Sequence, residues 1–126
     1  MSFDLDNVVM RVTATAANGV VDANTSVSFR QRGSRVVGRY CGGRVRRGWL
    51  VGAISGSRLT FRYAQAESTG AIAGGESVIA GGGSVIHAGR SACEIEALAD
   101  GRLRLLEHFR WSTRAGGGTN IFEQDC

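Results

Sequence analysis

Residues 102–111 read Arg-Leu-Arg-Leu-Leu-Glu-His-Phe-Arg-Trp, the longest run in the chain in which apolar and polar side chains alternate. Successive side chains of a β-strand point to opposite faces, so alternation with a period of two predicts a strand with one buried face. Asp100-Gly101 directly precedes the run, and Asp-Gly is a strong hairpin-turn dipeptide. Before that turn, Ala92 to Leu98 reads as a partner strand. The segment therefore predicts an antiparallel hairpin.

The rest of the chain repeats this pattern of short segments, rich in β-branched and aromatic residues, that end at glycine-containing turns. Asn18-Gly19, Gly33-Ser34, Gly42-Gly43 and Gly56-Ser57 are typical turn dipeptides. The strands predicted between them and near the C-terminus are Val8 to Ala16, Ser26 to Gln31, Val36 to Cys41, Val45 to Ile54, Leu59 to Gln65 and Thr119 to Phe122.

About eight or nine strands at this spacing predict an all-β fold. An open sheet of that length would leave two unpaired edges, so we expect an antiparallel meander that closes into a small lipocalin-like or calycin-like barrel. The alternative is an open antiparallel sheet packed on one helix. Such a helix could come only from residues 68–90, where the alternation is weakest.

A length of 126 residues fits a single domain, 1–126, that can bury its own core. The glycine-rich stretch at about 74–90 interrupts the regular strand spacing. It contains a short internal repeat, Ser77-Val78-Ile79-Ala80 and then Ser84-Val85-Ile86-His87. The chain has no lysine, so a phosphate-binding Walker loop is excluded. We interpret the stretch as an insertion that forms a hairpin or a local duplication.

All 15 basic residues are arginine, and the formal net charge is +4. Arginine suits phosphate and carboxylate ligands, but a GC-rich genome produces the same composition. Aromatic residues fall on the apolar faces and do not interleave with the arginines, so nucleic-acid binding is not expected. The chain contains no apolar run of about 20 residues, and its acidic beginning does not resemble a signal peptide. We expect a cytoplasmic protein that does not insert into membranes.

Metal and cofactor sites are not predicted. Cys41, Cys93, Cys126, His87 and His108 show no spacing typical of zinc ligands, and an odd number of cysteines is a poor disulfide framework. We expect Cys41 and Cys93 to be small buried apolar residues. His108 alternates away from the apolar face and is expected in solvent.

The inward face of the 102–111 strand contains one carboxylate, Glu107, among leucine and aromatic side chains. A buried carboxylate must pair, hold its proton or line a wet cavity. Gln65 continues the apolar face of its own strand, and the face shared with Val45 places Arg47 and Trp49 inward. The hypothesis is a polar cluster of Arg47, Gln65 and Glu107 that forms a ligand-binding site, with aromatic walls from Tyr40, Trp49, Tyr63 and Trp111. The alternative is an internal salt bridge that only fixes strand register.

Three segments carry a resemblance to a family of small bacterial proteins: a GG-x-V-x-x-G-x-L-x-G segment that begins at Gly42, an F-x-Y strand that begins at Phe61, and a D-G-R-L-R-L-x-E-x-x-x-W hairpin that begins at Asp100. The chain resembles this family from about Val27 to Trp111, and members are often labelled N-acetylglutamate synthase. That activity implies an acetyltransferase fold with a Q/R-x-x-G-x-G/A turn before a helix, which this sequence lacks. The resemblance implies a β-domain and brings no catalytic residues.

The function expected from the sequence is that of a non-enzymatic barrel, one that binds a small ligand inside. One alternative is a structural or protein-interaction module that acts as a homo-oligomer, such as a homodimer. The other alternative is an enzyme that uses Glu107 as acid or base.

Overall fold

The computed structural model describes residues 3–16, 20–68 and 84–125. These residues form eight strands: β1 (Val9–Ala14), β2 (Ser26–Arg32), β3 (Arg35–Gly42), β4 (Val45–Ser55), β5 (Arg58–Ser68), β6 (Ser84–Ala97), β7 (Leu103–Trp111) and β8 (Gly117–Gln124).

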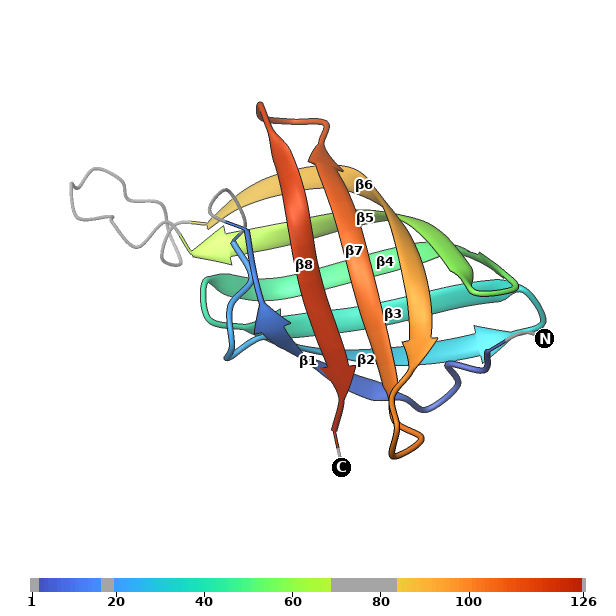
Figure 1. The fold of residues 1–126 in the computed structure, drawn as a ribbon. Coiled ribbons are helices and arrows are strands. Elements are labelled where there is room, and N and C mark those ends of the chain that lie inside the picture. The colour runs from blue at the N-terminus through green and yellow to red at the C-terminus, as the bar shows by residue number, and fades with distance from the viewer. Residues whose placement is uncertain (1–2, 17–19, 69–83, 126) are drawn as a thin grey trace.

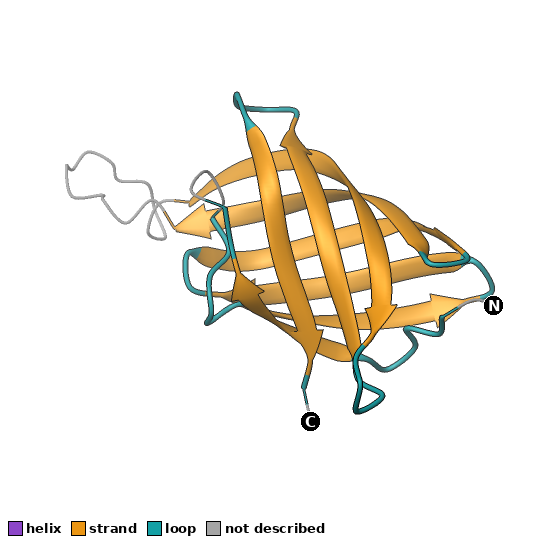
Figure 2. Cartoon of the chain, in the orientation of Figure 1, coloured by secondary structure: helices purple, strands orange, loops and turns teal. Residues whose placement is uncertain are grey.

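Each strand pairs antiparallel with the next, and β1 closes the ring by pairing with β8 (Figure 1). The predicted all-β barrel is therefore confirmed, as a calycin-like closed meander. The sheet is closed, so the alternative of an open sheet packed on a helix is wrong. Figure 2 shows the strands and loops of the described part of the chain. Nor does the described part contain a helix long and apolar enough to span a bilayer.

The hairpin predicted from residues 92–111 is β6 and β7, paired in register with Cys93 opposite Glu107. Gly101 has a φ of 90°, a conformation that glycine adopts readily, and its amide donates to the Leu98 carbonyl oxygen at 2.9 Å. Ser84 to Arg90, the last part of the predicted insertion, belongs to β6 and pairs with β5. Residues 74–83, like the Asn18-Gly19 turn, lie outside the described residues.

The core lies in the barrel interior, because alternate residues of the strands point inward. The largest fully buried side chains include Phe29, Leu5, Met10, Leu59 and Leu105. Cys93 is buried as expected, whereas Cys41 is exposed on β3, so the expectation that Cys41 is a core residue is wrong.

A β-bulge near the start of β4 reverses which of its residues face the core. The register shifts between Val45 and Arg47, so that Val45 is buried and Arg46 and Arg47 are both exposed. Trp49 is consequently 47% exposed, on the outer face. The prediction that Arg47 and Trp49 point into the barrel is wrong, because it assumed unbroken alternation from Val45.

Beyond the bulge, Gly48 makes room for an aromatic side chain inside the barrel. Tyr40, Gly48 and Gln65 lie side by side on three adjacent strands. A Cβ atom at Gly48 would lie only 2.3 Å from the Tyr40 ring. Because glycine leaves this space open, Tyr40 lies across it and donates its hydroxyl to Gln65 Oε1 at 2.7 Å.

We expect Gly48→Ala to lower the free energy of unfolding by about 1–3 kcal/mol, the usual cost of overpacking a core. Urea unfolding measures the change. On a Tyr40→Ala background the same substitution should cost less, because the ring that it displaces is gone. Equal costs on the two backgrounds would show that Tyr40 does not set the requirement for glycine.

A polar and aromatic pocket at one end of the barrel

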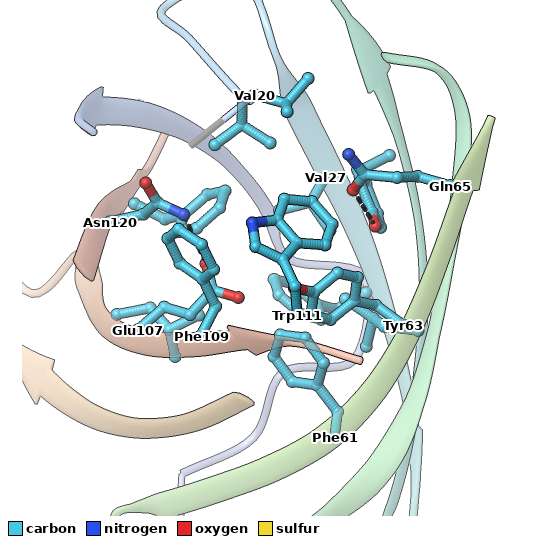
Figure 3. A pocket seen from close by; sticks show the side chains of 15 residues that line it. Val20, Val27, Phe61, Tyr63, Gln65, Glu107, Phe109, Trp111 and Asn120 are labelled. Atoms are coloured by element: carbon cyan, nitrogen blue, oxygen red, sulfur yellow. Dashed lines mark hydrogen bonds between the residues drawn. The ribbon is translucent and has the colours of Figure 1, made fainter. Parts of the chain in front are cut away.

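The interior contains a cavity of about 40 Å³, enough for about three water molecules. It lies toward the end of the barrel where β5 and β7 finish and β8 begins. Figure 3 shows Trp111 between Glu107 and Asn120 on one side and Gln65 on the other. The side chains that line the cavity are mostly apolar or aromatic; the polar ones among them come from Tyr40, Tyr63, Gln65, Glu107, Trp111 and Asn120.

Glu107 is held by two hydrogen-bond donors from the neighbouring strands. Ser91 Oγ donates to Glu107 Oε2 at 2.6 Å, and Asn120 Nδ2 donates to Glu107 Oε1 at 2.9 Å. Asn120 Oδ1 in turn accepts from the Thr15 hydroxyl at 2.8 Å. Since both carboxylate oxygens are engaged within the protein, Glu107 joins three strands and the segment after β1 into one polar cluster.

Burial raises the pKa of Glu107, and the hydrogen bonds from Ser91 and Asn120 only partly offset that rise. The folded protein therefore keeps the Glu107 proton at pH values where the unfolded chain has lost it. Burial in the cavity wall therefore favours the neutral, protonated form of the Glu107 carboxyl group.

We expect this raised pKa to make stability fall as pH increases. Between the ordinary glutamate value of 4.5 and the higher folded value, the folded state binds more protons than the unfolded state, so the free energy of unfolding decreases with pH. Glu107→Gln should abolish this part of the decline. The measurement is urea unfolding of both proteins from pH 4.5 upward, and parallel curves would contradict the assignment.

A second series of hydrogen-bonded polar side chains lies on the other side of the pocket. Gln65, which accepts the Tyr40 hydroxyl, donates its Nε2 to Glu67 Oε2 at 2.8 Å. Arg114, from the segment between β7 and β8, donates to Glu67 Oε1 at 2.6 Å. The same guanidinium lies over the Trp111 ring, 4.3 Å from its centroid. Arg114 thus neutralises a buried carboxylate and covers an aromatic wall.

Two donors at the pocket have no partner. Among the described residues, Tyr63 Oη and Trp111 Nε1 are the buried side-chain polar atoms that make no hydrogen bond. Their residues are each 7% exposed, and their rings meet edge to face with centroids 5.5 Å apart. Burial and the nearby Glu107 raise the pKa of Tyr63, so the hydroxyl stays protonated and remains a donor. A buried donor without an acceptor costs about 1–3 kcal/mol, which an acceptor in the cavity would recover.

The structure brings together most of the residues that the sequence analysis proposed. Glu107, Gln65, Tyr40, Tyr63 and Trp111 all line the cavity. Arg47 and Trp49 do not, because of the bulge in β4. His108 is exposed, as expected.

Sequence reasoning missed Glu67, Ser91, Asn120 and Arg114. Three of them continue an alternation already recognised: Glu67 follows Gln65, Ser91 precedes Cys93, and Asn120 precedes Phe122 by two residues. Arg114 lies between two strands, where no periodicity indicates its direction.

The fold and the pocket together define a small calycin-like barrel with a polar and aromatic cavity in its interior. The family model described as "Avidin-like protein" matches residues 3–82, more than half of the chain, and the chain belongs to the avidin-like family. The match includes Tyr40, Tyr63 and Gln65, whereas Glu107 and Trp111 follow it. A search of curated proteins and a search of solved structures found no match.

Proposed function

We propose that this protein binds a small, uncharged and largely apolar molecule inside the barrel, through one hydrogen-bond acceptor on that molecule. The observation that carries the proposal is the pair of unpartnered donors, Tyr63 Oη–H and Trp111 Nε1–H, at an aromatic cavity. Small eight-stranded barrels have interiors that can hold one small ligand. Membership of the avidin-like family is consistent with this use of the interior.

The charges around the cavity favour a neutral ligand. Arg114 is already paired with Glu67, so its charge is compensated within the protein. Glu107 already accepts two hydrogen bonds and would repel an anion when ionised. A carbonyl oxygen on an apolar ring offers an acceptor to these donors without bringing a charge into the interior.

The test uses two probes of nearly equal shape, cyclopentanone and methylenecyclopentane, which differ in a carbonyl oxygen against a methylene group. We expect the wild-type protein to bind cyclopentanone more tightly. Tyr63→Phe should weaken cyclopentanone binding about tenfold, the effect of one hydrogen bond of about 1.4 kcal/mol, and should leave methylenecyclopentane unchanged. Affinities come from NMR titration.

Tyr63→Phe also provides its own folding control. Because it removes a buried hydroxyl that has no partner, the variant should be at least as stable as the wild-type protein. Equal affinity of the wild-type protein for both probes, or equal weakening of both in the variant, would contradict the proposed role of the donors.

A second candidate function is self-association through the outer face of β3 and β4. Val37, Trp49 and Val51 are 42%, 47% and 51% exposed, and Val37 lies directly opposite Val51. Large apolar side chains gathered on one face are typical of contacts between copies of a chain.

We expect Trp49→Ser to shift the protein to a smaller sedimentation coefficient if this face joins two copies. The matched control is Val85→Ser, at another exposed apolar residue, 41% exposed and on β6. A wild-type protein that sediments as a monomer at high concentration would exclude the second candidate.

A further inference from the structure

Three arginines lie directly beside one another on the outside of the barrel, on neighbouring strands. Arg62 of β5 is opposite Arg90 of β6, and Arg90 is opposite Arg110 of β7. All three side chains are exposed. Figure 1 shows these strands side by side, and adjacent strands are about 4.8 Å apart. The register therefore concentrates three positive charges in one short row.

Among the described residues, no carboxylate forms an ion pair with Arg62, Arg90 or Arg110, although two other arginines of these strands are paired. Arg58 pairs with Glu94 across β5 and β6, and Arg104 pairs with Glu96 across β6 and β7. The same strands thus place acidic residues opposite arginines elsewhere. Like charges directly opposite each other in a sheet are destabilising, so Arg62, Arg90 and Arg110 reduce stability in the absence of an anion.

The arginine row also lines a groove in the surface. Arg62, Arg90 and Arg110 share this groove with Thr60 and His108. The groove thus combines three guanidinium groups with a hydroxyl and an imidazole, all of which can donate hydrogen bonds. Guanidinium groups bind phosphate oxygens in bidentate fashion, and such charge-assisted hydrogen bonds are among the strongest in proteins.

We propose that this groove is a binding site for a small phosphorylated compound, in which Arg62, Arg90 and Arg110 converge on a phosphate or diphosphate group. The phenyl rings of Phe61 and Phe109, whose residues also line the groove, are buried in the core. The groove therefore offers no exposed ring for stacking a nucleic-acid base, which favours a compact anion. The site lies on the outer face of the barrel, whereas the pocket proposed above lies in its interior.

The experiment measures pyrophosphate binding by isothermal titration calorimetry at low ionic strength, in the wild-type protein and in two variants. Arg90→Gln removes the central charge of the row. Arg39→Gln removes an exposed arginine from the outer face of β3, outside the groove, and changes the net charge equally. We expect Arg90→Gln to weaken pyrophosphate binding at least about tenfold and Arg39→Gln to change it less than twofold.

Stability supplies a second readout. Because the central charge is repelled by both neighbours, Arg90→Gln should unfold at a temperature no lower than the wild-type protein, and pyrophosphate should raise the wild-type midpoint more than that of Arg90→Gln. Absence of pyrophosphate binding would overturn the proposal. Equal losses in the two variants would overturn it as well, because they would indicate only an effect of net charge. Binding restricted to long duplex DNA or to vesicles containing phosphatidylserine would also overturn the proposal.

Discussion

Trp111→Ala is expected to lower the free energy of unfolding by about 3–5 kcal/mol, the usual range for truncation of a large buried aromatic residue. The Trp111 ring lies edge to face with the rings of Tyr63 and Phe109 and beneath the Arg114 guanidinium. Removing the indole therefore leaves a void at the junction of the core and the pocket. Urea unfolding followed by far-UV circular dichroism measures the loss.

The other tryptophan of the chain is a matched control. Trp49 is 47% exposed on the outside of β4, so Trp49→Ala should cost less than about 1 kcal/mol. Iodide should quench the fluorescence of Trp49 far more than that of Trp111, each measured in the variant that retains only that tryptophan. Similar costs for the two substitutions would contradict the inward and outward placement of these residues.

Arg114→Ala is expected to cost about 3 kcal/mol, because it leaves the buried Glu67 carboxylate without its cation. The exposed fraction of the Glu67 side chain is only 4%. Gln65 still donates one hydrogen bond to Glu67, but a neutral amide does not compensate a buried negative charge. Chemical unfolding at neutral pH measures the loss.

Two comparisons separate this buried pair from an ordinary surface ion pair. Arg58→Ala breaks an exposed pair with Glu94 and should cost less than about 1 kcal/mol. Combining Arg114→Ala with Glu67→Gln should recover much of the loss, since no buried charge then remains. If Arg114→Ala costs no more than Arg58→Ala, the Arg114–Glu67 pair does not stabilise the barrel.

Much of the fold could be predicted from local pattern. Alternation in residues 102–111 and the Asp100-Gly101 turn predicted β6 and β7. The segments that end at glycine-containing turns predicted the other strands. Closure followed from the cost of unpaired sheet edges. The bulge at Arg46 and Arg47 could not be located this way. One additional residue reverses the face of the sheet to which each later side chain of the strand points, and it leaves the composition of the strand typical.

The site was predictable to the extent that it depends on alternation. Glu107, Gln65 and the inward tyrosines follow from the period of two along their strands. The partners of Glu107 could not be identified, because Ser91 and Asn120 come from different strands whose relative register is set by the closed barrel. Arg114 was assigned no role for a different reason: its position between strands leaves its direction to tertiary contacts.

Binding of a ligand acceptor by the interior donors is observed most directly at the Trp111 indole N–H. The two tryptophans of the chain give two indole N–H resonances in a ¹H–¹⁵N correlation spectrum, which the Trp49→Ala variant assigns. On titration with cyclopentanone, we expect a downfield shift of the Trp111 indole proton and no shift of the Trp49 proton. With methylenecyclopentane, the downfield shift should be absent. A Trp111 resonance that does not respond to cyclopentanone, or that responds equally to both compounds, would contradict hydrogen bonding from the indole to the ligand.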